Sequence, residues 1–171
     1  MKLRELQEKD VEGMLEWMKD PTVNQYFRFD SEGATKDTVA NFIKAAQEQF
    51  EKGETYHYAI VNEQDEYQGT ISLKQIDINA KTAEYAISLR AGAQGKGIGT
   101  WATKEVLKIA FEELNLNRVY LNVLSRNESA IRMYKKCGFQ YEGEFKDHLY
   151  IKGEVQSLQW YAILREEYRR L

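Results

Sequence analysis

A glycine-rich segment near the middle of the chain has the residues needed to bind an anion through its main chain. It follows an alternating apolar stretch and precedes a long amphipathic one, which predicts a strand, a turn and a helix. N–H groups at a helix N-terminus lack intrahelical acceptors, and the helix dipole adds positive charge there. Gly97 and Gly99 leave room for a phosphate, whereas a purely structural turn needs one glycine. The segment comprises Gln94, Gly95, Lys96, Gly97, Ile98, Gly99 and Thr100.

The glycine spacing narrows the kind of phosphate ligand. A nucleoside triphosphate loop needs Gly-x-x-x-x-Gly-Lys followed by Ser or Thr, and no window of the chain supplies it. A dinucleotide fingerprint needs a third glycine three residues after the second. The position three residues after Gly99 is Ala102, which only some versions tolerate. The dinucleotide match is therefore weak.

A second segment, residues 127–139, reads as a short capped helix with a tyrosine. Asn127 is a good N-cap, and Gly138 is a natural C-terminal stop before Phe139. Ala130 and its apolar neighbours form the packed side of this helix. Tyr134 is either a half-buried aromatic or a phenol that can donate a proton.

The two segments together resemble the GNAT superfamily of acyl-CoA-dependent N-acetyltransferases. The pyrophosphate loop of that family has the pattern Arg or Gln, x, x, Gly, x, Gly or Ala, which Gln94, Gly97 and Gly99 match. The family's next motif is an Asn, a short helix with a Tyr, and Gly-Phe, as in residues 127–139. Softer matches at residues 17–23, 113–121 and 142–153 are similar to the branch of ribosomal-protein and spermidine/diamine N-acetyltransferases.

This resemblance implies an α+β (mixed α/β) fold in a single domain, residues 1–171. Its central, mostly antiparallel sheet is splayed at the cofactor site and has helices on both faces. It implies acetyl-CoA as cosubstrate without a metal, with Tyr134 protonating the departing thiolate and a backbone N–H around Leu89 meeting the oxyanion. The implied cofactor-binding residues are Ile87, Ser88, Leu89, Gln94, Gly95, Lys96, Gly97, Ile98, Gly99, Thr100, Asn127, Ala130 and Tyr134.

Acetyl transfer needs a neutral amine, although an alkyl amine has a pKa near about 10. A carboxylate can remove the proton directly or through water. Glu84 is the best candidate, because it lies in the strand that leads to the glycine loop. Strand alternation puts it on the face opposite Tyr85 and Ile87. The alternative is an exposed strand residue without a role.

The acceptor site is expected between the first two helices, where the family usually builds it. The candidate residues there are Tyr26, Phe27, Arg28, Asp30 and Glu32. Aromatic walls and carboxylates suit a cationic amine on a small molecule, which we favour over a protein N-terminus. A polyamine would need more carboxylates, whereas Arg28 could hold a phosphate or carboxylate, as in a nucleotide-linked amino sugar. Two other classes stay open: a non-catalytic acyl-CoA-binding protein and a regulatory interaction module that binds no CoA.

Composition fits a compact enzyme. The 171 residues are 43% hydrophobic and carry a net charge of -3, which argues against a nucleic-acid partner. No run of eighteen apolar residues and no signal-peptide pattern occur, so we expect a cytoplasmic protein without a membrane partner. Cys137 is the single cysteine, which excludes an intrachain disulfide. One cysteine and two histidines are also too few, and too far apart in the sequence, to form a metal site. Assembly into a homo-oligomer stays open.

The periodicity of the chain also predicts its elements. A first helix should start at Asp10 and stop at Asp20–Pro21, and a second should run over residues 36–52 with Gly53 just beyond. A third helix follows the glycine loop. Strands are expected at residues 56–61, 67–75, 82–89, 118–124, 139–145 and 155–164. We expect the strand at 118–124 to be buried on both faces.

Overall fold

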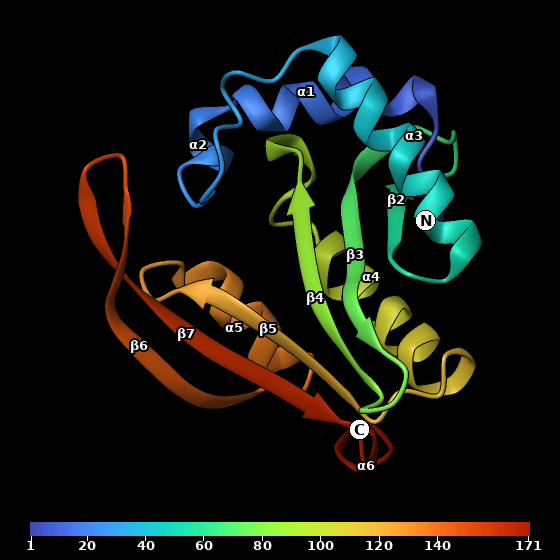
Figure 1. Cartoon of the computed structure of the whole chain (residues 1–171), viewed down its shortest axis with the longest axis vertical. Helices are drawn as coiled ribbons and strands as arrows, with labels where there is room; N and C mark the ends of the chain where they lie inside the picture. The colour runs from blue at the N-terminus through green and yellow to red at the C-terminus, as the bar shows by residue number, and fades with distance from the viewer.

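The structure is a computed structural model that describes residues 1–171, and its framework is one seven-stranded sheet (Figure 1). The strands lie in the order β1-β2-β3-β4-β5-β7-β6. All neighbours are antiparallel except β4 and β5. The mostly antiparallel sheet predicted above is thus confirmed. The strands are β1 (Lys2–Glu5), β2 (Tyr56–Val61), β3 (Tyr67–Asp77), β4 (Thr82–Leu89), β5 (Arg118–Leu124), β6 (Gln140–Ile151) and β7 (Glu154–Leu164).

The sheet opens between β4 and β5. These strands pair only from Thr82–Arg118 to Glu84–Tyr120. Beyond Glu84, β4 stays paired with β3 as far as Leu89, and β5 stays paired with β7 as far as Leu124. The two halves of the sheet therefore separate, as the diverging β4 and β5 in Figure 1 show. This gap confirms the predicted splay.

Helices cover both faces of the sheet. On the α1/α3 face, side chains of α1 and α3 pack on Ala59 and Val61 of β2. On the α4/α5 face, side chains of α4 and α5 pack on Ile71 of β3 and Tyr85 of β4. No helix is both long and apolar enough to cross a membrane. The helices are α1 (Val11–Lys19), α2 (Pro21–Asn24), α3 (Lys36–Lys52), α4 (Ile98–Lys108), α5 (Glu128–Lys136) and α6 (Arg165–Tyr168).

Local sequence signals fix the helix ends. The Thr35 side chain accepts a hydrogen bond from the Thr38 N–H at 3.2 Å, and Gly53 ends α3 in the left-handed region at a φ of 70°. The predicted helix at residues 36–52 is therefore confirmed. The first helix differs slightly, because a 3₁₀ turn at Glu8–Asp10 precedes α1. Pro21 then opens the short helix α2 at its first position, where a missing N–H costs nothing.

Three expectations about the strands were incomplete or wrong. The edge strand β1 was not predicted, because it has only four residues and three of them are charged. The expected burial of residues 118–124 on both faces was wrong. Val119, Leu121 and Val123 are buried under the α4/α5 layer, and Leu124 is buried in a small separate cluster, whereas the other three residues of the strand are half-buried. Strand β6 runs on to Ile151 instead of ending at residue 145, and bulges interrupt its register.

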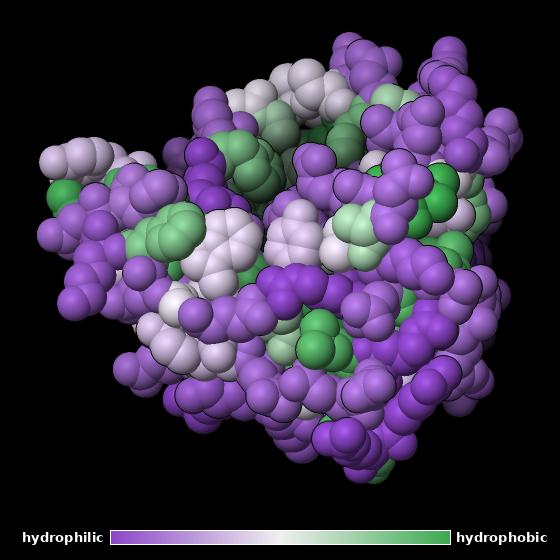
Figure 2. All heavy atoms as spheres, turned by 60° about the horizontal axis from the view of Figure 1, so that its bottom comes forward, coloured by the Kyte–Doolittle hydropathy of each residue, from purple (hydrophilic) through white to green (hydrophobic).

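The resulting β6–β7 hairpin projects beside α2 (Figure 1), and Figure 2 shows a hollow beside this projecting lobe.

A close backbone approach at Gly69 supports the end of β4. A Cβ atom there would lie 2.4 Å from the Ser88 carbonyl oxygen, so β3 or β4 would have to move. We expect Gly69→Ala to lower the free energy of unfolding by about 1–3 kcal/mol, measured by urea unfolding. Gly143→Ala is the control, because a Cβ there meets no atom within 4 Å. Equal stability of the two variants would contradict the close approach.

Candidate active site

The turn between β4 and α4 presents free main-chain donors. Gly95 and Gly97 adopt left-handed conformations, with φ of 71° and 78°. A Cβ atom at either residue would meet nothing within 4 Å, so the main chain faces open space. The first bond of α4 joins the Trp101 N–H to the Gly97 carbonyl at 3.0 Å. The three preceding N–H groups, from Ile98 to Thr100, consequently have no acceptor within the helix.

The other residues of this turn have different environments. Gly99 is buried, and a Cβ there would lie 3.3 Å from Leu89 Cδ1 and 3.6 Å from Met133 Cε. Its small size thus lets α4 pack against β4 and α5. Gln94 donates from Nε2 to the Leu89 carbonyl at 3.3 Å, which ties the turn to the end of β4, while Lys96 is exposed. The anion-binding geometry therefore rests on Gly95 and Gly97 more than on Gly99.

Tyr134 lies on the α4/α5 face. The Asn127 side chain caps α5 by accepting from the Ala130 N–H at 3.4 Å. One turn later the Tyr134 ring, 7% exposed, packs edge-on against Tyr85 with a centroid distance of 5.6 Å. Burial, and then the nearby Cys137 thiol, raise the pKa of Tyr134 above its usual range. The phenol is therefore protonated at neutral pH.

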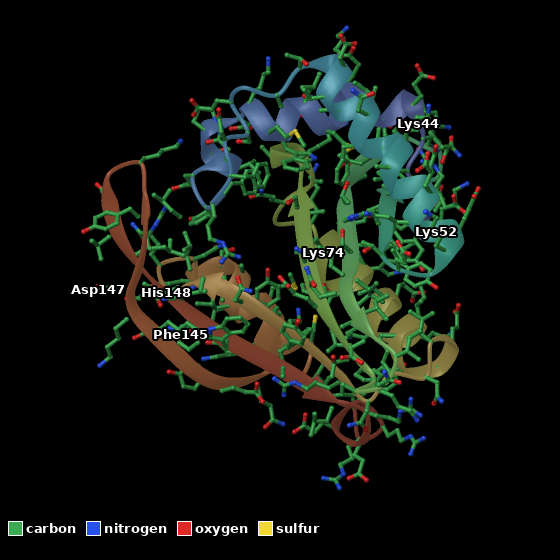
Figure 3. All side chains as sticks on the ribbon, in the orientation of Figure 1. Lys44, Lys52, Lys74, Phe145, Asp147 and His148 are labelled. Carbon is green, nitrogen blue, oxygen red and sulfur yellow. The ribbon has the colours of Figure 1, made fainter.

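Glu84 lies on the opposite face of the sheet, as the alternation predicted. It is opposite Lys74 of β3 and Tyr120 of β5. Lys74 Nζ lies 3.5 Å from Glu84 Oε1, and the Glu84 side chain is 19% exposed (Figure 3). Burial, and then the charge of Glu84, raise the pKa of Tyr120. Ile87 shares the α4/α5 face with Tyr85, whereas Ser88 shares the α1/α3 face with Glu84.

The two faces of the sheet therefore present different side chains near the gap between β4 and β5. A buried phenol lies on one face of the sheet and a carboxylate on the other. A molecule that passed through the gap could meet both, and its phosphate end could reach the open turn at the start of α4. This arrangement suits a long, thin cosubstrate whose reactive end crosses the sheet.

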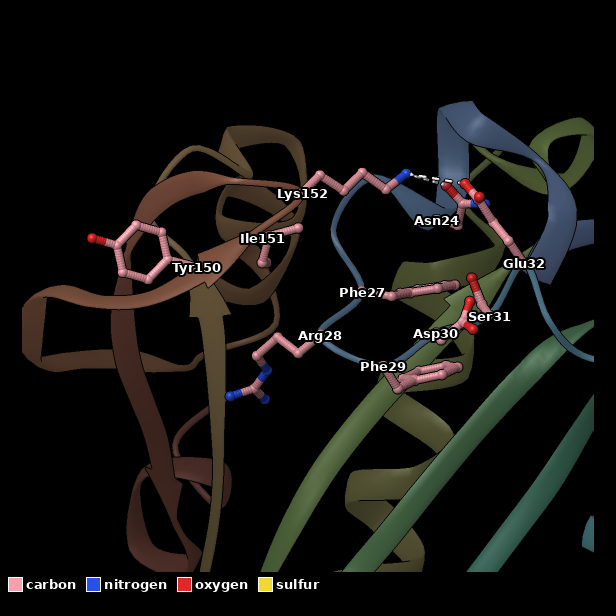
Figure 4. A pocket seen from close by; sticks show the side chains of 10 residues that line it. All are labelled: Asn24, Phe27, Arg28, Phe29, Asp30, Ser31, Glu32, Tyr150, Ile151 and Lys152. Atoms are coloured by element: carbon pink, nitrogen blue, oxygen red, sulfur yellow. Dashed lines mark hydrogen bonds and ion pairs between the residues drawn. The ribbon is translucent and has the colours of Figure 1, made fainter.

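A pocket of about 310 Å³ lies beside the gap, under the segment between α2 and α3 (Figure 4). Phe27 and Phe29 stack in parallel in its wall, with centroids 5.1 Å apart. Of the five residues predicted to bind the acceptor, Phe27, Arg28, Asp30 and Glu32 line this pocket. The remaining lining residues are Asn24, Phe29, Ser31, Tyr150, Ile151 and Lys152.

Tyr26 does not line this pocket. It packs on the small cluster of Leu124, Ile151 and Leu158, and the Arg126 guanidinium lies 4.9 Å from its ring centroid. The geometry therefore gives Tyr26 a packing position against the β6–β7 hairpin and the end of β5.

Sequence reasoning missed the residues that β5 and the β6–β7 hairpin contribute. Lys152, at the tip of the β6–β7 hairpin, lies 3.2 Å from Glu32 and 3.3 Å from Asn24 (Figure 4). Arg28 reaches β5, where it donates to Asn122 Oδ1. Alternation along β5 could have put Asn122 on the face of Tyr120, but no local signal joins either residue to the α2–α3 segment.

Neither histidine forms a nucleophilic pair with Cys137. Cys137 is buried on the α4/α5 face, and burial raises its pKa, which keeps it a thiol. His57 Nδ1 lies 2.6 Å from Ser72 Oγ on the other face, and burial followed by the charge of Lys74 lowers its pKa to about 4. His148 is exposed on β6. No cluster of three or more His, Cys, Asp or Glu side chains could hold a metal ion.

Comparison with known proteins decides the family. Residues 1–140 match the family model of the acetyltransferase (GNAT) domain. The chain belongs to the GNAT acetyltransferase family. It is therefore an enzyme of the N-acetyltransferase class, and its sheet with a gap beside a glycine-rich turn is the GNAT fold.

Relatives and solved structures agree with this assignment. The spermidine N(1)-acetyltransferase of Escherichia coli (strain K12) is 29% identical over 168 residues, which cover 98% of this chain and 88% of that protein. The probable N-acetyltransferase YjcK of Bacillus subtilis (strain 168) is 38% identical over 127 residues, 73% of this chain and 70% of that protein. The crystal structure of a spermidine N-acetyltransferase from Vibrio cholerae in complex with CoA and spermine aligns with a TM-score of 0.87 at 23% identity, over 98% of this chain and 97% of that one.

Proposed function

We propose that this GNAT enzyme transfers an acetyl group from acetyl-CoA directly to a primary amine of a small molecule. The observation that carries the proposal is the gap between β4 and β5, which has an open glycine turn at one end and a pocket beside it. No covalent enzyme intermediate is needed when the amine and the thioester are held together.

The residues around the gap fit acetyl-CoA. The N–H groups from Ile98 to Thr100 would bind the pyrophosphate, which Gly95 and Gly97 leave free to approach. The end of β4, from Ile87 to Leu89, has main-chain groups without a partner on the β5 side, and these can pair with the amides of the pantetheine arm. Asn127 and Ala130 at the start of α5 would line the other side of the arm. The CoA-bound relative from Vibrio cholerae supports the same cosubstrate.

The reaction divides between the two faces of the sheet. Glu84 takes a proton from the ammonium group, directly or through water, and frees the nitrogen lone pair. The amine nitrogen attacks the thioester carbon, and a main-chain N–H near Leu89 stabilises the oxyanion. The carbon–sulfur bond then breaks, and the phenol of Tyr134 donates its proton to the thiolate. The attacking nitrogen, which is still positively charged, loses its second proton to water, and a proton from water restores the phenol. The products are the N-acetylated amine and CoA.

The acceptor is a small amine, because the pocket of about 310 Å³ is framed by the Phe27–Phe29 stack and the β6–β7 hairpin. Relatives named as spermidine N-acetyltransferases make polyamines one class to test. Amino sugars, amino acids and peptide N-termini are the others. A thiol-release assay with acetyl-CoA across these classes is the decisive experiment. Robust acetylation of a peptide alone would overturn the choice of acceptor, and CoA binding without any turnover would make the protein an acyl-CoA sensor.

The glycine turn is tested by Gly97→Val. A branched side chain would occupy the space that the pyrophosphate needs. We therefore expect the affinity for CoA, measured by calorimetry, to fall by more than about tenfold. Gly53→Val is the control, because it puts a branched side chain on another left-handed residue, at the end of α3 and away from the turn. Unchanged CoA binding by folded Gly97→Val would refute the turn as the pyrophosphate site.

The role of Tyr134 is tested by Tyr134→Phe, which keeps the buried ring and removes the proton. We expect kcat to fall by about 10²-fold, the usual contribution of a positioned acid, with CoA affinity unchanged. Tyr141→Phe, which alters an exposed ring on β6, serves as the control and should keep full activity. Wild-type turnover by Tyr134→Phe would mean that the thiolate leaves without this donor.

The role of Glu84 is tested by Glu84→Gln. An amide of the same shape cannot accept the proton, so activity should recover only toward higher pH, where more of the acceptor is a free amine. The measurement is the pH profile of kcat/KM beside that of Glu54→Gln, an exposed carboxylate outside the site. Identical profiles for both variants would remove Glu84 from the mechanism.

A further inference from the structure

Three side chains with N–H donors meet on the α1/α3 face beyond the gap. Asn122 of β5 and Trp160 of β7 are directly opposite each other in the antiparallel register, so their side chains are neighbours on one face. Arg28 crosses from the α2–α3 segment and donates from Nη2 to Asn122 Oδ1. We call Arg28, Asn122 and Trp160 the donor cluster.

Trp160 lacks the partner that a buried donor normally has. Its Nε1 is the one buried side-chain nitrogen or oxygen in the protein without a hydrogen bond. The rings of Tyr120 and Phe145 pack beside the indole, at centroid distances of 6.3 and 5.4 Å. An unpaired buried donor costs about 1–3 kcal/mol, so a small shift of the indole that brought Nε1 to a ligand oxygen would recover that free energy.

The carboxylates around the acceptor pocket already have partners. Glu84 pairs with Lys74, and Glu32 pairs with Lys152. Asp30 accepts from the Gly33 N–H at 3.1 Å. Arg28, by contrast, bonds only to the neutral Asn122, so its positive charge has no carboxylate partner. The donor cluster itself therefore carries a positive charge and no carboxylate, which favours an anion there.

We propose that the acceptor amine carries an oxyanion, a carboxylate or a phosphate, that binds the donor cluster. The planar guanidinium of Arg28 pairs with such a group through two parallel hydrogen bonds, while Asn122 Nδ2 and Trp160 Nε1 donate to the oxygen lone pairs that the guanidinium leaves free. This inference rests on the proposed function, because the acceptor must place its amine near Glu84 while its oxyanion binds the donor cluster.

The sheet register sets the size of this acceptor. Tyr120 lies opposite Glu84, and Asn122 is two residues further along β5, which corresponds to roughly 7 Å. The amine and the oxyanion of the acceptor should be separated by about that distance. A hexosamine phosphate or a diamino acid has this spacing, whereas an α-amino group beside its own carboxylate is too close.

The test compares matched amines that differ in the oxyanion. Thiol release is measured for glucosamine 6-phosphate against glucosamine, for ornithine against putrescine, and for spermidine. We expect at least one oxyanion-bearing member to exceed its partner, and spermidine, by about tenfold or more in kcat/KM. The pair that shows the preference distinguishes phosphate from carboxylate. Equal or better turnover of putrescine, glucosamine and spermidine would overturn the proposal.

Variants assign the preference to the donor cluster. Arg28→Met should reduce the ratio within the favoured pair about tenfold or more, and Trp160→Phe, which keeps a ring, should raise KM for the favoured acceptor with little change in kcat. Lys44→Met removes a positive charge from the exposed side of α3 (Figure 3) and should leave the ratio unchanged. A wild-type ratio in both folded cluster variants would refute the assignment.

A failure of the proposed function would look different. If no amine supports thiol release, calorimetry on the CoA-loaded protein still measures binding of glucosamine 6-phosphate and ornithine. Binding that Arg28→Met weakens about tenfold or more supports the donor cluster as an oxyanion site without turnover. Absence of binding by both compounds refutes it.

Discussion

The site depends on how few residues of β4 and β5 pair with each other. Parallel pairing stops at Glu84 and Tyr120, although both strands continue and stay bonded to their outer neighbours. Main-chain N–H and C=O groups inside a protein need partners, so two strand edges that face each other without bonds are unusual. A ligand with amide groups of its own can satisfy them, so the gap suits an extended ligand that pairs with main-chain groups.

The same gap also lies between two different side-chain environments on the two faces of the sheet. Tyr134 is buried among aromatic rings, and its pKa is raised, so its phenol is protonated. Glu84 lies among polar side chains with Lys74 beside it. A continuous sheet would isolate these environments from each other.

Local patterns predicted the elements well, and long-range register limited the rest. Helix α3 and strands β2, β4 and β5 have their predicted bounds, because periodicity, the Thr35 cap and Gly53 all act within a few residues. The glycine turn was equally local, although only the structure separates the open Gly97 from the packed Gly99. The pairing of Asn122 with Trp160 and the contact of Lys152 with Glu32 join residues far apart in the chain, and no periodic signal encodes them.

The contacts that close the acceptor pocket are of a different kind from those that hold the sheet. Lys152 and Glu32 remain more than half exposed where they meet, and such surface pairs contribute about 0–1 kcal/mol each. The wall formed by residues 27–32 and the hairpin tip is thus joined by weak polar contacts, while the strands that carry Glu84 rest on two apolar layers. Changes in this wall can therefore alter which amine is accepted at little expense to folding. Substrate preference can drift among members of such a family faster than the chemistry they share.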